Sequence, residues 1–378
     1  MDMIADMHCD TLSTLRAKRK QGQELRLKDA EGFHVNLEKM RAGGYAVQNF
    51  AAFIDMGEGR DPFEDAMELV ALFEAEMRKN ADWVRPVTTA EEIEANADAG
   101  LLSAMLTLEE GGMCKGDVGK LEEFFRRGAR MMTLCWNYEN DLATPASPIS
   151  EGEKPQSTRP DPSLPGLKEK GVLIVEAMES LGMIPDVSHL SDAGFYDVCR
   201  ICRKPFVASH SNARAICNHA RNLSDDMLRQ LGEHGGVAGL NYFPEFIFET
   251  QNFARLTGAP EAETTQSTST SPDAGKSQPQ SGERVPRGES GPSGEDRWDR
   301  EACLTLLARH ARHMANCGGS ECVGLGSDFD GFGGACAPEG ADKAEDLAWA
   351  LHREGFRDGE VDGILYGNVM RLYRETLR

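Results

Sequence analysis

Side chains that bind divalent metals recur along the sequence, each close to the end of a short apolar run. The first pair is His8 and Asp10, which follow the run that begins at Met3. In a strand, residues two apart point to the same side, so both side chains can reach one ion. Imidazole nitrogen and carboxylate oxygen suit zinc or a similar divalent metal. One such pair is weak evidence alone, and it gains weight only where other ligands converge on it.

Further acidic residues and histidines end later apolar runs: Glu109 with Glu110, His189, His210 and Asp328. Parallel α/β barrels place their active sites at the C-terminal ends of the strands, so we expect these side chains to meet at one mouth. Two imidazoles, the His-x-Asp pair and one glutamate are enough ligands for two metals that share the carboxylate. Two such ions activate a water held between them and polarise a carbonyl group.

The elements that must position these residues alternate between apolar runs of strand length and longer amphipathic segments. This alternation is typical of βα units around a parallel sheet. Eight strands are predicted, at residues 3–8, 45–53, 102–109, 129–136, 184–189, 206–210, 237–242 and 322–328. The apolar spacing of residues 62–80 predicts a helix, with Asp61 as its N-cap. The predicted fold class is therefore α/β, a (β/α)8 TIM barrel with a binuclear metal site at the C-terminal ends of its strands.

The chain of 378 residues is long enough for one large barrel, and we predict a single domain over residues 1–378. Residues 257–296 interrupt the pattern, because Val285 is their only aliphatic or aromatic residue besides three alanines. Such a segment cannot bury enough apolar surface to offset the entropy lost on ordering. We predict a disordered low-complexity insertion there. Gly326 and Gly331, on either side of Asp328, are expected to allow a tight turn at the barrel rim.

Charge and hydropathy exclude several classes of partner. The 41 Lys and Arg residues against 62 Asp and Glu give a formal net charge of −21, which repels nucleic acid and anionic membrane surfaces. No apolar run approaches the ~20 residues of a membrane-spanning helix, and the N-terminus lacks the pattern of a secretory signal. We therefore expect a cytoplasmic protein with a small-molecule substrate, no nucleic-acid partner and no membrane partner. The sequence leaves the oligomeric state open, a homodimer included.

In combination, these residues resemble the membrane (renal) dipeptidase family of zinc-dependent hydrolases. The resemblance covers nearly the whole chain apart from residues 257–296, and it rests on the early His-x-Asp, Glu109-Glu110-Gly111-Gly112, the strand-end His189, Ser209-His210-Ser211, the segment from Arg221 to Asp226, and the segment from Gly326 to Gly331. It implies an amidohydrolase-like barrel that hydrolyses the peptide bond of dipeptides. It also implies two zinc ions per chain, bridged by a glutamate, with these further ligands: His8 and Asp10 on one, His189 and His210 on the other.

The bridging glutamate has two candidates. The Glu-Gly-Gly match favours Glu110, whereas counting without gaps from Gly100 and from Gly128 puts the family's bridging position on Glu109. We assign the bridge to Glu109 and keep Glu110 as the alternative.

The resemblance also implies roles for residues near the substrate. Arg221 matches the family's substrate-binding arginine, and a guanidinium binds a carboxylate in a bidentate manner. Asp328 matches the acid/base aspartate, which takes a proton from the attacking water and passes it to the leaving amine. Where the family commonly has a histidine, this chain has Trp136. Trp136 and Asn137 are the local candidates for substrate binding.

Two other functions stay open. The first is hydrolysis of another small amide, lactam or ester at the same metal site, which Trp136 makes credible. The second is a barrel without catalytic activity that keeps its metals for structure or binds a ligand through its acidic surface.

Overall fold

The computed structural model describes residues 3–149, 158–248, 300–333 and 337–377. Within them, eight parallel strands form a barrel in the order β2-β1-β9-β8-β7-β6-β5-β4, closed by pairing between β2 and β4. These strands are β1 (Ile4–Asp6), β2 (Tyr45–Phe53), β4 (Leu102–Glu109), β5 (Ala129–Thr133), β6 (Ile184–Asp186), β7 (Val207–Ala208), β8 (Val237–Leu240) and β9 (Val323–Leu325). Each lies within a predicted strand, and the predicted (β/α)8 barrel is confirmed.

The sequence pattern missed one short strand, β3 (Val84–Val87), which pairs in parallel with the first half of β4. Farther along β4, from Leu106 onward, β5 takes this place. Arg85 and Pro86 are exposed, and a proline cannot donate a ladder hydrogen bond, so this strand lies at an edge outside the closed barrel.

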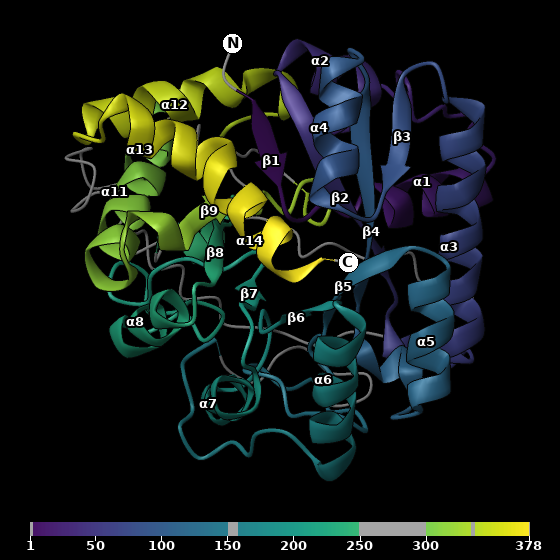
Figure 1. Cartoon of the computed structure of the whole chain (residues 1–378), viewed down its shortest axis with the longest axis vertical. Coiled ribbons are helices and arrows are strands. Elements are labelled where there is room, and N and C mark those ends of the chain that lie inside the picture. Colours follow the sequence, from purple (N-terminus) through teal and green to yellow (C-terminus); the bar gives the residue numbers. More distant parts are fainter. Residues whose placement is uncertain (1–2, 150–157, 249–299, 334–336, 378) are drawn as a thin grey trace, which may run out of the picture.

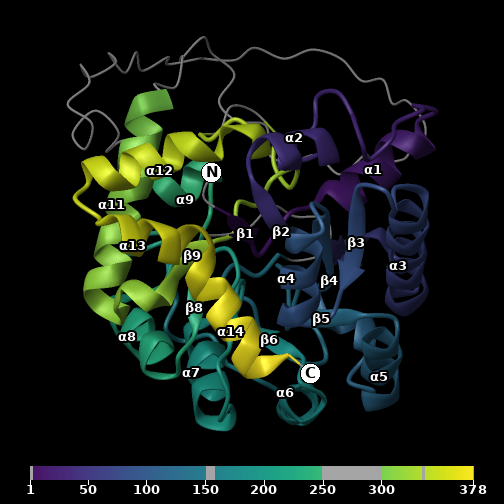
Figure 2. The same ribbon diagram turned by 45° about the horizontal axis from the view of Figure 1, so that its top comes forward.

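Helices surround the barrel (Figures 1 and 2). Their bounds are α1 (Thr11–Lys20), α2 (Leu37–Ala42), α3 (Pro62–Lys79), α4 (Ala90–Asp98), α5 (Val118–Arg126), α6 (Glu169–Leu181), α7 (Asp192–Ile201), α8 (Asp225–Glu233), α9 (Pro244–Ile247), α11 (Arg300–Gly318), α12 (Ala344–Arg353), α13 (Asp358–Asp362) and α14 (Asn368–Thr376). The predicted helix at residues 62–80 is α3, and the Asp61 side chain accepts hydrogen bonds from its first turn. None of the described helices combines the length and hydropathy needed to cross a bilayer. The predicted insertion at 257–296 lies outside the described residues.

One end of the barrel is filled by α14, which crosses in front of the strands in Figure 1. Val369 and Tyr373 of this helix belong to an apolar cluster with the first residues of three strands: Ile184 of β6, Val207 of β7 and Val237 of β8. The N-terminal end of the barrel is therefore plugged by apolar side chains. Polar chemistry is left to the opposite end, where the strands finish.

Glycines allow the strands to approach one another closely in the barrel interior. A Cβ added to Gly326 would lie 1.6 Å from the carbonyl oxygen of Ser209, and one added to Gly239 would lie 2.0 Å from the same atom. Gly326 does not adopt a positive φ. The expectation of a tight turn at Gly326 is therefore wrong, and this glycine is required by space rather than by backbone conformation.

We expect Gly326→Ala to lower the free energy of unfolding by about 3 kcal/mol or more, because the new methyl group would overlap a backbone oxygen that cannot move away alone. Chemical denaturation followed by circular dichroism measures the change. Gly333→Ala is the matched control, since nothing lies within 4 Å of its added Cβ. Equal stability of the two variants would contradict the argument.

Candidate metal centre

The predicted site residues come together at the C-terminal end of the barrel, most of them just beyond the strands. Glu109 is the last residue of β4, whereas the others follow strands that end earlier than predicted: His8 and Asp10 after β1, His189 after β6, His210 after β7 and Asp328 after β9. The strand argument for the His-x-Asp pair is therefore wrong in detail, because β1 ends at Asp6. Nevertheless His8 Nε2 lies 3.4 Å from Asp10 Oδ2.

The carboxylate of Glu109 lies at the centre of this cluster. Its Oε1 is 3.2 Å from His189 Nε2 and 3.8 Å from His210 Nε2. Its other oxygen, Oε2, is 3.3 Å from His8 Nε2. The two oxygens of one carboxylate thus face different imidazoles, with His189 and His210 near Oε1 and His8 near Oε2.

Hydrogen bonds fix how His210 and His189 present their rings. The Ser209 hydroxyl donates to Asp186, so its oxygen accepts from His210 Nδ1, 2.7 Å away. The amide oxygen of Asn137 accepts from His189 Nδ1 at 3.0 Å. Both protons are then on Nδ1, and both Nε2 atoms carry lone pairs. These two nitrogens lie 3.0 Å apart and face the same carboxylate oxygen, which is an arrangement that a bound cation would satisfy.

Burial also shifts the pKa values of the histidines and of Glu109. It lowers the pKa values of His189 and His210 well below the usual range, with nearby Arg221 and His8 among the further causes, so both rings are neutral and free to act as ligands. Burial, reinforced by Asp10, raises the pKa of Glu109. His8 has a raised pKa, since the Glu109 and Asp10 carboxylates outweigh its own burial.

A divalent cation would resolve two further features of this cluster. Asp10 Oδ1 and Glu109 Oε2 are buried without a hydrogen-bond partner in the described structure, and such atoms are costly unless something binds them. The cluster contains two groups of three side chains, and within each group the donor atoms lie within 4.8 Å of one another. One group is His8, Glu109 and His210, and the other is His8, Asp10 and Asp328. The residues present therefore fit metal ligation.

Among the described residues, the carboxylate of Glu110, unlike that of Glu109, is hydrogen-bonded to backbone and amide donors of the chain. Its carboxylate accepts hydrogen bonds from the backbone nitrogens of Gly112 at 2.7 Å and Trp136 at 2.8 Å, and from the Asn140 side-chain amide. Burial raises its pKa to about 6. The side chain joins the loops that follow β4 and β5, and its acceptor positions are already filled by donors of the chain.

Two aspartates at strand ends support the ligands, and the sequence analysis missed both. Asp6 Oδ1 accepts from the backbone nitrogens of His8 and Ser327, and Asp186 Oδ1 accepts from those of Ser188 and Ser209. Each carboxylate therefore holds a ligand-bearing loop to its neighbour. Their position in the sequence could have identified them, since each aspartate stands two or three residues before a predicted histidine ligand.

Arg221 lies beside the cluster as a buried cation with little bound to it. Its two terminal nitrogens make long contacts of 3.3 Å, to Ser211 Oγ and to the His210 carbonyl oxygen, and its Nε has no partner in the described structure. Burial lowers its pKa to about 10, opposed by Asp328 and Glu109, so the group stays charged at neutral pH. A buried guanidinium with an unpartnered Nε and two long hydrogen bonds is suited to bind an anionic ligand group.

Asp328 is held near both His8 and a neutral donor. Its Oδ1 lies 3.8 Å from His8 Nε2, and its Oδ2 accepts from the Asn241 amide at 3.0 Å. Burial raises its pKa to about 6, a range suited to proton transfer near neutral pH. Asp328 and His189 both adopt positive φ, at 61° and 72°. Such backbone strain persists only where the surrounding structure imposes it.

Trp136 borders the site as part of an aromatic wall. Its ring centroid lies 5.0 Å from that of Phe53, 5.8 Å from Tyr138 and 6.2 Å from the ligand candidate His189. The neighbouring Asn137, predicted to bind substrate, has its amide oxygen on His189 Nδ1. The structure places Trp136 at the edge of the site and Asn137 behind a histidine.

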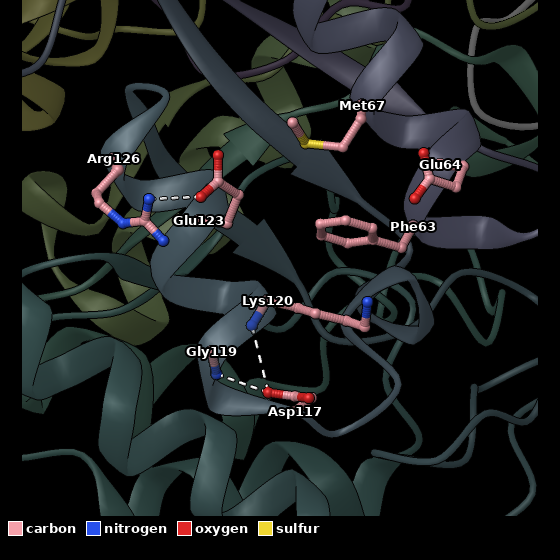
Figure 3. Close-up of a pocket in the computed structure, with 8 residues that line it drawn as sticks. All are labelled: Phe63, Glu64, Met67, Asp117, Gly119, Lys120, Glu123 and Arg126. Carbon is pink, nitrogen blue, oxygen red and sulfur yellow. Dashed lines mark hydrogen bonds and ion pairs between the residues drawn. The ribbon is translucent and has the colours of Figure 1, made fainter.

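A hollow elsewhere on the molecule is lined by none of the predicted site residues. It lies between α3 and α5, where the Lys120 ammonium is 3.8 Å from the ring centroid of Phe63 and where Asp117 caps α5 (Figure 3). The hollow is open to solvent and lacks histidine and cysteine. We therefore place the candidate chemistry at the barrel mouth.

A parallel (β/α)8 barrel with buried histidines and carboxylates at its C-terminal mouth fits a metal-dependent hydrolase. Within that class, residues 2–378 match the family model described as membrane dipeptidase, peptidase family M19. The chain belongs to this family. This confirms the resemblance inferred from the motifs and the expected dipeptidase function.

Comparison with individual proteins gives the same family. The chain is 28% identical over 394 residues to an uncharacterized dipeptidase of Schizosaccharomyces pombe, covering 99% of this chain and 80% of that protein. Among solved structures it is similar to the dipeptidase AC, with 22% identity, a TM-score of 0.76, and coverage of 100% of this chain and 99% of that one. A metallopeptidase from Rhodobacter sphaeroides, liganded with a phosphinate mimic of the dipeptide L-Ala-D-Ala, also has 22% identity and a TM-score of 0.76, covering 99% of each chain. At 22% identity these structures show the fold.

Substitution of the two adjacent glutamates distinguishes their roles. We expect Glu109→Gln to lose at least half of the bound divalent metal and to lower dipeptide turnover by about 10² or more, because the amide cannot supply two anionic oxygens. Glu110→Gln should retain metal but lower the free energy of unfolding by about 1–3 kcal/mol, since its amide nitrogen would face a buried N–H donor. Elemental analysis and denaturation on the same preparations check both. The reverse pattern would assign the bridge to Glu110.

Proposed function

We propose that the chain is a zinc-dependent dipeptidase with two ions per chain, in which Glu109 is the shared ligand. The observation that carries the proposal is the placement of the two Glu109 oxygens, one toward His189 and His210 and the other toward His8. His189 and His210 would hold one ion, and His8 with Asp10 the other. Neutral imidazole and carboxylate are ligands that zinc favours.

Two zinc ions in these positions would activate a water molecule and polarise the peptide carbonyl. The remaining steps fall to the side chains. Asp328 Oδ1 faces the cluster, whereas its Oδ2 is anchored by Asn241, so the carboxylate is held toward the reacting atoms. Asp328 takes the proton of the attacking water and returns it to the amine nitrogen as the peptide bond breaks.

Arg221 sets the orientation of the dipeptide. Its unpartnered Nε and weakly bound terminal nitrogens would bind the C-terminal carboxylate of the substrate in a bidentate manner. Binding would give a buried cation its missing counter-charge. A substrate with a free carboxylate close to the scissile bond is therefore preferred over a neutral amide.

Trp136 and Asn137 have separate roles in this proposal. The Trp136 ring, packed against Phe53 and Tyr138, forms a wall beside His189 and contacts the substrate. Asn137 is a positioning residue, because its amide oxygen fixes the tautomer and the direction of His189.

Turnover of a substrate panel by zinc-loaded protein tests the proposed function. The panel contains L,L and L,D dipeptides, the same dipeptides with an amidated C-terminus, and a small ester and lactam. We expect about two zinc equivalents per chain that resist dialysis, and turnover of the free dipeptides, with kcat/KM lowered at least tenfold by amidation. A single zinc equivalent in saturated protein would disprove the binuclear scheme, and a preference for the ester or lactam would disprove dipeptides as the substrate class.

Asp328→Asn separates proton transfer from metal binding. An amide has a similar shape but cannot accept the proton of water, so we expect kcat to fall by about 10² to 10⁴ while the zinc content and the fold stay near wild type. Measurement of kcat and bound zinc on one preparation is the test. Loss of zinc, with partial recovery of rate on adding the metal, would make Asp328 chiefly a ligand. A fall of less than about tenfold would remove it from the proton-transfer step.

A further inference from the structure

Outside the barrel, α8 and α11 lie side by side in the helical layer (Figures 1 and 2). His313 and Cys317 are four residues apart on α11, so their side chains lie on one face of the helix. Asp225, the first residue of α8, lies opposite that face. Three different side chains that bind metals therefore meet at the junction of two helices, at a place with no part in dipeptide hydrolysis.

The Cys317–His313 distance is that of two ligands on one small cation, whereas the shorter His313–Asp225 contact is a hydrogen bond that an ion would have to open. His313 Nε2 lies 2.7 Å from Asp225 Oδ1, and Cys317 Sγ lies 3.6 Å from the same nitrogen. All three donor atoms lie within 4.8 Å of one another. Tetrahedral zinc, with bonds of about 2.3 Å to sulfur and about 2.0 Å to nitrogen, would separate those two atoms by about 3.5 Å.

Without an ion, the His313 ring hydrogen-bonds to Asp225, and the Cys317 thiol lies within hydrogen-bonding reach of both groups. A divalent cation placed among the three atoms would bind all of them at once. The side chains of His313 and Asp225 are 29% and 52% exposed, so a fourth position is open to water.

We propose that Asp225, His313 and Cys317 form a second, peripheral zinc site, separate from the centre at the barrel mouth. A thiolate, an imidazole and a carboxylate are a donor set typical of zinc, and the sulfur distinguishes it from the nitrogen and oxygen donors of the barrel mouth. Because three partly exposed residues supply it, the site holds its ion more weakly than the buried centre and exchanges it with solution.

The position of the site gives the ion a structural consequence. Asp225 follows Arg221 by four residues, so a bound ion would tie the end of the arginine-bearing loop to α11. A second contact already joins the same partners, since His310 of α11 accepts from the backbone nitrogen of Ala213 at the start of that loop. Occupancy of the peripheral site is therefore expected to raise the melting temperature of the enzyme.

Cobalt provides a test that reads the sulfur ligand directly. Full-length protein with its barrel centre preloaded with zinc is titrated with Co²⁺, and the near-ultraviolet charge-transfer absorption of a cobalt–thiolate bond is recorded. We expect this absorption to saturate near one equivalent in the wild type. Cys317→Ser and His313→Asn should each abolish it. Cys199→Ser is the matched control, a partly buried helical cysteine that should leave the absorption unchanged.

The variants also separate this proposal from the proposed function. Dipeptide turnover and the two zinc equivalents of the barrel mouth should persist in Cys317→Ser and His313→Asn, and circular dichroism verifies their fold. Absence of the thiolate absorption in wild-type protein at millimolar Co²⁺ would overturn the peripheral site. Its persistence in either variant would overturn the assigned ligands. Two variants guard against the chance that one of them fails to fold.

Discussion

The structure depends on one buried carboxylate, that of Glu109, surrounded by three imidazoles. A carboxylate removed from water is unstable unless cations or hydrogen-bond donors replace its hydration. The histidines that surround it come from beyond three different strands, β1, β6 and β7, whereas Glu109 itself ends β4. A closed parallel barrel brings all of these strand ends to one mouth. Pairing of β2 with β4 closes this mouth, and the apolar side chains of α14 fill the other end of the barrel.

The loops that carry the ligands are held by hydrogen bonds rather than by strand pairing. The strands stop early, at Asp6 and Asp186, and those two carboxylates accept the backbone N–H groups of the ligand-bearing turns. This release from ladder geometry lets His189 and Asp328 adopt positive φ and aim their side chains inward. Asp330 has a related role, because its carboxylate accepts from Thr11 and from the backbone of His34.

Much of this arrangement could be predicted from the sequence because it follows from periodicity and spacing. Apolar runs of strand length identify all eight barrel strands, whereas β3 escapes because Val84–Val87 is short, half exposed and contains a proline. The convergence of the candidate ligands follows from residue type near strand ends. The directions of the side chains could not be predicted, because a local sequence pattern fixes neither the tautomer of His189 nor the hydrogen-bond partner of Asn137. Such features arise from tertiary contacts between loops far apart in the chain.

The adjacent residues Glu109 and Glu110 show how one backbone angle separates two chemical roles. Glu109 is the last residue of β4, and its side chain enters the barrel mouth among the histidines. The next residue has a φ of 92°, which takes it out of the strand and brings its carboxylate to the N–H groups of Gly112 and Trp136. A glutamate saturated by chain donors has no free oxygens for a shared ion, whereas its neighbour has an unpartnered Oε2. The motif shared by both residues therefore encodes one candidate ligand and one carboxylate that holds the neighbouring loops together by hydrogen bonds.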